Sequence, residues 1–371
     1  MTDEKINKPF DFTAHLQSVE ENYKMIQILD ENGKIVNSDL LPDLSDEQLV
    51  GLFKDMLWSR ALNDRCIILA RQGRLGFFGP TAGQEASQLA SYLAFEKNDF
   101  LLPGYRDFPQ LVKHGLPLYK AFLWSRGHVE GGQFADDLHA ILPQVIIGAQ
   151  ITQAAGVGLG MKKRGKKQVA FTYTGDGGSS QGDFYEGINF AGAFKAPVVF
   201  FIQNNQYAIS THWRKQTAAN TLAQKAAAAG IPGVLVDGMD PLAVYAVSKA
   251  ARDYALAGNG PVLIETYTSR FQPHSLSGDD PKLYRDEASF AQWEAKDPLI
   301  RTRIYLTEKG LWDKDQEEGL IKQFDKEIQE AVKQADNAPK QKVSQFLELM
   351  FEKPTQLLKE QIEYYKNKEG D

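Results

Sequence analysis

Cysteine is almost missing from this chain of 371 residues, in which Cys66 is the only one. A single cysteine excludes an internal disulfide, a paired redox thiol and a metal cluster built on several cysteines. The chain therefore fits a reducing compartment, and it carries no redox dithiol of its own.

Long apolar runs and a strong positive charge are also lacking. No stretch reaches the roughly 18 apolar residues that a membrane-spanning helix needs. The first residues, MTDEKINKPFDF, have no apolar signal core and are too acidic for a typical transit peptide. A net charge of −6 argues against a general nucleic-acid binder, which usually has a basic surface. We therefore expect a cytoplasmic protein that binds neither membranes nor nucleic acid.

The composition, with 43% hydrophobic and 24% charged residues, is that of a soluble globular protein. The length allows one large α/β domain with extensions, or two modest domains. We expect a loose polar arm over residues 1–44, with a short hairpin at Asn32-Gly33. An α/β domain over 45–310 would follow, and then a helical extension over 311–371 packed on the same domain.

Two apolar runs rich in β-branched and aromatic residues, Val169–Thr174 and Val198–Gln203, predict buried strands. The segment between them, Gln181–Lys195, has room for a crossover helix, so the two strands should be parallel. Strand and helix patterns continue to alternate through Thr268. The expected fold is therefore α/β, a mostly parallel sheet with helices on both faces.

Polar and glycine residues follow both strands at the points where they end. Gly175-Asp176-Gly177-Gly178 comes after the first strand, and Asn204-Asn205 after the second. Parallel strands end at one edge of the sheet, so Asp176 and Asn205 should face one shared ligand. A carboxylate, an amide oxygen and nearby glycines suit Mg²⁺ that carries a diphosphate.

Other interpretations of these glycines are weaker. The dinucleotide fingerprint needs a third glycine where Ser180 stands, and a phosphate loop should follow a strand, whereas Gly160–Lys167 precedes one. Asp176 alone would suit a helix cap at an ordinary turn. The asparagine pair after the next strand favours the metal site instead.

The motif and its surroundings resemble one enzyme family. Gly175-Asp176-Gly177, then 26 residues, then Asn204-Asn205 is similar to the thiamine diphosphate signature. The longer segments GFFGPTAGQEA, GDGGSSQGDFYEGINFAGAFKAP, QNNQYAIST and HSLSGDDPKLYR resemble the alpha subunits of the decarboxylating component of 2-oxo acid dehydrogenases, in particular the pyruvate dehydrogenase family. The likeness covers most of the chain.

The resemblance implies a set of site residues. Asp176, Asn205 and the backbone carbonyl of Tyr207 would bind Mg²⁺. Tyr105, Arg106 and Arg270 would contact the diphosphate of the cofactor. His274 would lie over the active site on a loop and assist acyl transfer, and Ser275 and Ser277 fall where animal relatives are phosphorylated. Ile146 and Ile147 align with residues whose backbone contacts the cofactor's pyrimidine ring. His128, in a second glycine-rich loop, is a further candidate catalytic residue, and Gln84-Glu85 would lie near the substrate entry.

The resemblance also implies a reaction and partners. The family decarboxylates a 2-oxo acid oxidatively with thiamine diphosphate and Mg²⁺, and passes the acyl group to a lipoyl group on an acyltransferase core. Only one cofactor-binding domain is evident here, so a beta subunit should supply the other half of the site in an assembly of two alpha and two beta chains. Pyruvate is the expected substrate, with branched-chain 2-oxo acid and acetoin dehydrogenases as the enzymatic alternatives. A non-catalytic scaffold subunit is the alternative from another class.

Overall fold

Five parallel strands form the central sheet of the computed structural model, which describes residues 21–369. Their spatial order is β1-β2-β3-β7-β6, and the register places Gly175 beside Gln203, so β2 and β3 end at the same edge. The predicted α/β fold is confirmed. The strands of this sheet are β1 (Phe100–Leu102), β2 (Ala170–Gly175), β3 (Val198–Asn204), β6 (Gly233–Asp237) and β7 (Val262–Tyr267), and β4 (Tyr207–Ala208) pairs antiparallel with β5 (Thr211–His212) beside it.

Alternate residues of the strands enter two different apolar cores. Val199 and Phe201 of β3 point into the larger core, whereas Val198 and Phe200 point into the smaller one. A strand whose two faces are both buried reads as a continuous apolar run, because successive side chains point to opposite faces. This is why the pattern of β3 has no polar alternation.

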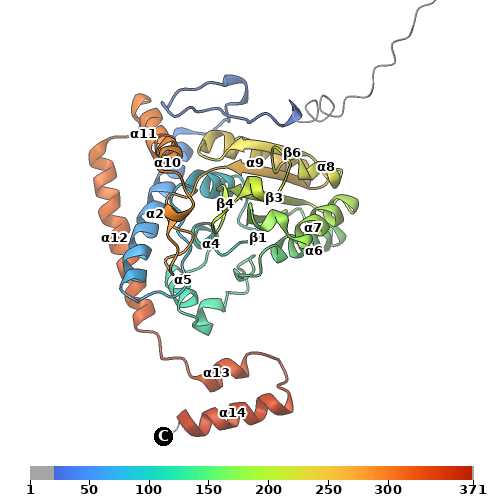
Figure 1. Ribbon diagram of the computed structural model, residues 1–371, viewed down its shortest axis with the longest axis vertical. Coiled ribbons are helices and arrows are strands. Elements are labelled where there is room, and N and C mark those ends of the chain that lie inside the picture. Colours follow the sequence, from blue (N-terminus) through green and yellow to red (C-terminus); the bar gives the residue numbers. More distant parts are fainter. Residues whose placement is uncertain (1–20, 370–371) are drawn as a thin grey trace, which may run out of the picture.

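Helices cover both faces of the sheet (Figure 1). One face carries α6 and α7, and the other carries α2, α9, α11 and α12. The helix α2 begins with a capping box, in which Ser45 accepts a hydrogen bond from the Gln48 backbone. The helices are α2 (Asp46–Arg71), α3 (Ser91–Leu93), α4 (Phe108–His114), α5 (Leu118–Ser125), α6 (Ala149–Lys163), α7 (Gly182–Ala193), α8 (Lys225–Ala228), α9 (Pro241–Leu256), α10 (Glu287–Glu294), α11 (Pro298–Glu308), α12 (Lys314–Asp336), α13 (Val343–Glu348) and α14 (Gln356–Glu369).

Short helical turns connect several of these elements. The π-helical turn η3 leads directly into α3, and η5 lies between β2 and α7. These turns are η1 (Glu21–Tyr23), η2 (Ser38–Leu40), η3 (Ala86–Ala90), η4 (Val129–Gly132), η5 (Gly178–Ser180), η6 (Trp213–Lys215) and η7 (Pro281–Leu283).

The described part of the N-terminal segment, residues 21–44, is bound to the sheet more tightly than the predicted loose arm. Ile26 bridges to Val236 of the edge strand β6, and Ile28 and Leu29 are fully buried. Their two backbone N–H groups donate to the Asp240 carboxylate at 2.6 and 2.7 Å. A short apolar segment at a sheet edge is not long enough to show the hydrophobic periodicity of a strand or a helix, so the sequence does not predict its burial. The hairpin at Asn32-Gly33 is present, with Leu29 bridged to Ile35, and residues 1–20 of the arm lie outside the described residues.

The C-terminal extension divides into two parts. The helix α12 packs on α2 and α5. The prediction places all of 311–371 on the domain. In the structure α13 and α14 instead pack on each other and project beyond the body in Figure 1. Leu358 and Ile362 of α14 are buried in this small hairpin, while Leu349 and Phe351 in its turn are 59% exposed.

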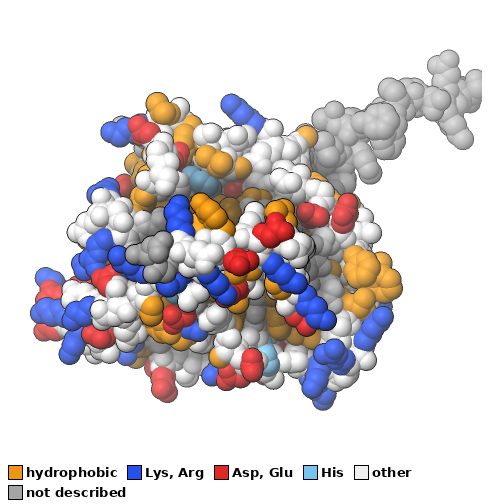
Figure 2. Space-filling view, turned by 90° about the horizontal axis from the view of Figure 1, so that it is seen from below, with side chains coloured by type: hydrophobic (Ala, Val, Ile, Leu, Met, Phe, Trp, Pro, Cys, Tyr) orange, Lys and Arg blue, Asp and Glu red, His pale blue; other side chains and the backbone are white. Residues whose placement is uncertain are grey.

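The face at the hairpin end of the molecule carries both charge signs. Figure 2 shows lysine and arginine side chains interspersed with aspartate, glutamate and hydrophobic ones, without a broad area of one sign. Within residues 21–369 no helix is both long and apolar enough to cross a membrane.

Candidate functional site

A cavity of about 350 Å³ opens where β2 and β3 end. This is the edge at which parallel α/β sheets bind ligands, since the loops there diverge from the strand ends. It brings together most of the predicted site residues from segments far apart in the chain. Those that line it are Gln84, Tyr105, Arg106, Ile146, Ile147, Gly175, Asp176, Gly177, Gly178, Asn205, Tyr207 and His274.

Asp176 and Asn205 form one side of the cavity, which we call the acidic flank. Both side chains are buried, and each has an amide partner. Gln216 donates to Asp176 Oδ2 at 2.9 Å, and Asn205 Nδ2 donates to Gln84 Oε1 at 2.9 Å. Burial raises the pKa of the Asp176 carboxyl to about 6, against a smaller lowering by the bond from Gln216.

The glycines between β2 and α7 serve different purposes. A methyl group on Gly178 would lie 1.9 Å from Thr174 Oγ1, and one on Gly177 would lie 2.7 Å from Ala208 Cβ. A methyl group on Gly175 would meet no described atom within 4 Å, although Gly175 lines the cavity. Gly177 and Gly178 thus allow neighbouring parts of the protein to pack closely against this turn, whereas the backbone of Gly175 is left open to a ligand.

Arg106 and His274 also line the cavity, and together with Arg270, which lies behind its wall, we call them the basic flank. Arg106 Nη1 donates to the Pro80 carbonyl at 2.5 Å, and its Nη2 donates to the His274 carbonyl at 3.1 Å. Arg270 does not line the cavity itself. It lies behind Ile209, whose carbonyl is 3.3 Å from Arg270 Nη2, and it is fully buried. Its Nε and Nη1 have no hydrogen-bond partner among the described residues.

The pKa values on this flank reflect crowded positive charge. Burial lowers the pKa of Arg270 to about 9, and the neighbouring Arg106 and Arg285 act in the same direction. Burial also lowers the pKa of His274 to about 4, again with help from Arg106 and Arg270. Like charges that are removed from water disfavour each other's charged forms. An anion in the cavity would relieve this, so the flank fits a ligand with several negative oxygens.

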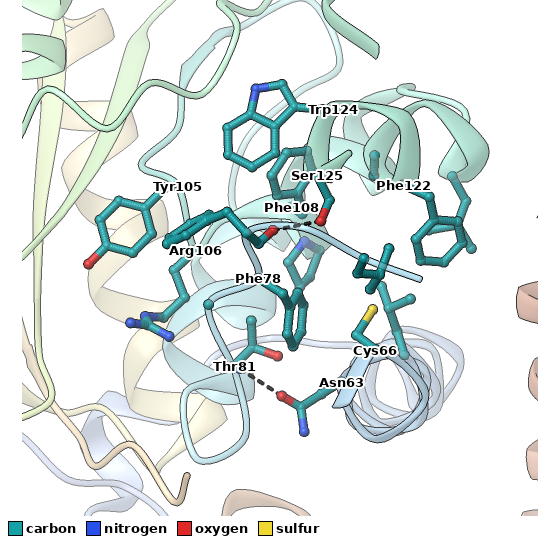
Figure 3. A pocket seen from close by; sticks show the side chains of 17 residues that line it. Asn63, Cys66, Phe78, Thr81, Tyr105, Arg106, Phe108, Phe122, Trp124 and Ser125 are labelled. Carbon is teal, nitrogen blue, oxygen red and sulfur yellow. Dashed lines mark hydrogen bonds between the residues drawn. The ribbon is translucent and has the colours of Figure 1, made fainter. Parts of the chain in front are cut away.

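The same turn that carries Tyr105 and Arg106 covers a second, smaller cavity of about 30 Å³ (Figure 3). Its walls are mostly apolar, and they include Phe78, Phe122 and the buried thiol of Cys66. A space of this size holds about one water molecule. Figure 3 shows the Arg106 guanidinium pointing away from Cys66. The charged group of Arg106 therefore contributes to the larger cavity.

His128 is not brought to the cavity. Its Nε2 lies 3.0 Å from the Pro339 carbonyl, and its Nδ1 accepts from the Glu130 backbone at the start of η4. The position of His128 therefore gives no support to a catalytic role. A glycine-rich loop can carry a polar side chain to any surface, and here the loop meets the linker before α13.

Several residues of the site escaped the sequence analysis. Gln203 and Asp107 line the cavity and hydrogen-bond each other at 2.6 Å, and neither was singled out. Gln203 did carry a signal, because a polar side chain that ends a wholly apolar strand needs a buried partner. Lys225 was also missed. It is buried, donates to the Ser179 carbonyl at 2.6 Å, and its pKa is lowered to about 8 by burial.

No group of three or more His, Cys, Asp or Glu side chains that could hold a metal occurs among residues 21–369. A cation at the acidic flank would thus rely on one carboxylate, an amide oxygen, a backbone carbonyl and oxygens of its ligand. That donor set is all oxygen, and it suits Mg²⁺ bound together with phosphate groups.

Comparison with known proteins agrees with the family resemblance of the sequence. Residues 54–344 match the dehydrogenase E1 component family. A protein of Staphylococcus aureus named pyruvate dehydrogenase E1 component subunit alpha is 60% identical over 366 residues, covering 99% of both chains. A protein of the same name from Staphylococcus epidermidis is 58% identical with the same coverage. The chain belongs to the dehydrogenase E1 component family.

Proposed function

We propose that this chain is the alpha subunit of a pyruvate dehydrogenase decarboxylating component. In this role it takes part in the oxidative decarboxylation of pyruvate and the transfer of the acetyl group to a lipoyl group of an acyltransferase core. The observation that carries the proposal is the cavity in which Asp176 and Asn205 face Arg106 and His274. The 60% identity to the staphylococcal protein over nearly the whole chain supports the substrate.

The residues of the cavity fit thiamine diphosphate and Mg²⁺. Asp176, Asn205 Oδ1 and the carbonyl of Tyr207 would hold the cation. Arg106 and Arg270 would neutralise the diphosphate, for which Arg270 has two unused N–H groups among the described residues. Bound thiamine diphosphate would supply the electron sink that decarboxylation requires. His274 is neutral at pH 7, so it can either donate or accept a hydrogen bond at the entrance.

A beta subunit would complete the site. The rim of the cavity carries a run of apolar residues, Val145, Ile146 and Ile147, which are 56%, 62% and 38% exposed. Consecutive exposed apolar side chains beside an active-site cavity fit a surface that a partner covers. We propose an assembly of two alpha and two beta chains, in which the partner holds the other end of the cofactor.

The test is to co-express the full chain with candidate beta subunits and to add thiamine diphosphate and Mg²⁺. Release of CO₂ is then measured from pyruvate, from branched-chain 2-oxo acids and from acetoin-type substrates in parallel. We expect turnover with pyruvate only when a beta subunit is present. Decarboxylation by the chain alone would contradict the shared site.

The same assay separates the alternatives. Faster turnover of a branched-chain substrate would favour the branched-chain dehydrogenase, and the acetoin arm is read in the same way. The absence of turnover with every beta subunit, in complexes that assemble, would favour a scaffold subunit. The presence of both Asp176 and Asn205 argues against that outcome.

A further inference from the structure

Four buried side chains form a continuous row of hydrogen bonds that ends at the acidic flank. We call Asp107, Gln203, Gln84 and Asn205 the amide relay. Gln203 Nε2 donates to Asp107 Oδ1 at 2.6 Å, Gln84 Nε2 donates to Gln203 Oε1 at 3.2 Å, and Asn205 Nδ2 donates to Gln84 Oε1 at 2.9 Å. None of the four residues is more than 8% exposed. The row therefore runs through the protein interior from α4 to the end of β3.

Asp107 sets the direction of every bond in the relay. All of its partners are N–H donors: Gln203, Gln88 and Gln110 donate to Oδ1, and the Gly104 backbone donates to Oδ2 at 2.8 Å. Burial raises the pKa of the Asp107 carboxyl, while the bonds from Gln203, Gly104, Gln110 and Gln88 act the other way. Because N–H donors occupy both of its oxygens, the carboxyl accepts, and Gln203 turns its NH₂ group toward Asp107. Its oxygen then faces Gln84, which must in turn present NH₂ to Gln203 and oxygen to Asn205. A reversed amide would place two like ends together in a buried site, at a cost that water cannot offset.

Asn205 is thereby left with one possible orientation. Its Nδ2 is used by Gln84, so Oδ1 is the end available to a ligand in the cavity, with the Tyr207 backbone N–H 3.4 Å away. Hard divalent cations bind oxygen and are repelled by an NH₂ group. The relay therefore holds Asn205 in the orientation that a cation needs, and the longer bond from the Tyr207 N–H to Oδ1 favours the same orientation.

The backbone around Gln84 is fixed as well. Gly83 has φ +94°, and a methyl group there would lie 2.2 Å from the Ser269 carbonyl. The Thr81 N–H donates to Asn63 Oδ1 at 2.8 Å, the bond drawn in Figure 3. The Gly83 N–H donates to the Glu85 carboxylate at 2.9 Å, and Glu85 is paired with Arg60. Gln84 therefore has little freedom to follow Asn205 if that side chain turns.

We propose that Gln84, oriented by Asp107 through Gln203, is a positioning residue that makes Asn205 present oxygen to a divalent cation. The proposal rests on the proposed function, because that function places a cation beside Asn205. Gln84 lies just before η3 and lines the cavity, and the role proposed for it acts through its bond to Asn205.

The test replaces Gln84 with methionine, which has similar volume and no amide. The full chain, co-expressed with its beta subunit, is titrated with Mg²⁺ by calorimetry in a fixed excess of thiamine diphosphate. We expect Gln84→Met to weaken Mg²⁺ binding about tenfold, in the range of about 10–100-fold found for groups that orient metal ligands. Gln110→Met is the matched control, because Gln110 is equally buried and donates to the same Asp107 oxygen at 3.1 Å but lies off the relay.

A thermal melt of each apo complex separates positioning from packing. If Gln84→Met and Gln110→Met lower the melting temperature alike while Mg²⁺ affinity stays at the wild-type value in both, the relay is only structural and the proposal is overturned. If Gln84→Met does not fold, Gln84→Asn takes its place. Its amide is one methylene too short to bridge Gln203 and Asn205, so the same weakening is expected.

Asn205→Ala distinguishes the failure of this proposal from the failure of the proposed function. Weaker Mg²⁺ binding in Asn205→Ala with unchanged binding in Gln84→Met would overturn the relay alone. Unchanged binding in both variants would overturn the metal site and the relay together. In the double variant, Gln84→Met should cause no further loss, because the oxygen that it orients is gone.

Discussion

Asp176 and Asn205 lie on one flank of the cavity, Arg106, Arg270 and His274 on the other, and the two flanks differ in how the protein satisfies their polar groups. On the acidic flank each side chain is hydrogen-bonded to a neutral amide, from Gln216 or Gln84. On the basic flank Arg270 is fully buried beside two other arginines and keeps two N–H groups without a partner among the described residues.

This difference indicates which flank the ligand must complete. Neutral amides can be ordered by the protein at modest cost, because each hydrogen bond replaces one to water. A buried cation needs a counter-charge, and the Nε and Nη1 atoms of Arg270 have no partner among the described residues. A cation bound to a diphosphate offers a positive charge to the acidic flank and negative charges to the basic flank. The acidic flank is thus prepared by the fold, while the basic flank depends on its ligand.

Removing the one carboxylate of the acidic flank should have the largest effect. We expect Asp176→Ala to weaken Mg²⁺-dependent binding of thiamine diphosphate by more than about 100-fold, since even residues that only orient ligands are worth roughly 10–100-fold. Calorimetry with the cofactor, with and without Mg²⁺, measures this. Asp183→Ala, which removes an exposed carboxylate in the first turn of α7, is the control and should bind normally. Unchanged affinity in Asp176→Ala would show that the metal lies elsewhere.

The buried arginine of the basic flank should respond in two opposite ways. Arg270→Met should weaken cofactor binding about tenfold or more, because a hydrogen bond to a charged group is worth roughly 1.5–3 kcal/mol. The same change should raise the free energy of unfolding of the apo protein, since it removes a buried guanidinium whose Nε and Nη1 have no partner among the described residues. Affinity is read by calorimetry and stability by denaturant titration.

Arg301 provides the contrast for that experiment. It is also fully buried, but it pairs with Asp237 at 2.9 Å and donates to the Leu29 carbonyl. Arg301→Met should therefore lower the free energy of unfolding, by about 3–5 kcal/mol if it behaves like other broken buried ion pairs. Its cofactor affinity should stay normal. A loss of stability in both variants would show that Arg270 is held by interactions other than those described above.

The comparison of the flanks also shows what the sequence could predict. Asp176 and Asn205 were found because each follows a buried strand, and strand ends of a parallel sheet have a fixed common edge. Residues that approach from loops distant in the chain, such as Gln84, Asp107 and Gln216, have no period that links them to the site. The family resemblance identified Arg106, Arg270 and His274, which composition alone would have left as ordinary loop residues. It could not show that Arg270 lies behind Ile209, or that His128 lies elsewhere.

The same reasoning explains the misplaced ends of the chain. Residues 1–44 are polar and interrupted by Pro9, Gly33 and Pro42, which predicts a loose arm and does not indicate that Ile28 and Leu29 are buried. The pattern of the C-terminal extension over 311–371 indicates helices, and α12, α13 and α14 form there. It could not show that α13 and α14 bury their apolar sides against each other, because a pattern defines a face and not its partner.

His274 should make the stability of the apo protein depend on pH. Its pKa is about 4 in the folded protein, below the ordinary value of 6.5, so the unfolded chain binds more protons between these two values. Stability from this group is therefore complete above pH 6.5 and is lost as the pH falls toward 4. The melting temperatures of the wild type and of His274→Gln should converge as the pH falls from 6.5 to 4. Above pH 6.5 the difference between the two melting temperatures should stay constant. His139→Gln, which changes a histidine outside the cavity, should keep the wild-type slope, and an equal slope in His274→Gln would contradict the assignment.

The smallest expected effect tests whether a ligand approaches the backbone between the flanks. A methyl group on Gly175 would meet no described atom within 4 Å, so Gly175→Ala should keep or slightly raise stability, by up to about 1 kcal/mol through the unfolded chain. If the diphosphate lies against this backbone, the methyl group should weaken its binding several-fold. Gly178→Ala gives the opposite pattern, because the new methyl group would lie 1.9 Å from Thr174 Oγ1 and must lower stability first. Cofactor affinity by calorimetry and melting temperature are measured for both variants. Normal affinity in a stable Gly175→Ala would mean that the ligand spans the two flanks without touching the strand end that joins them.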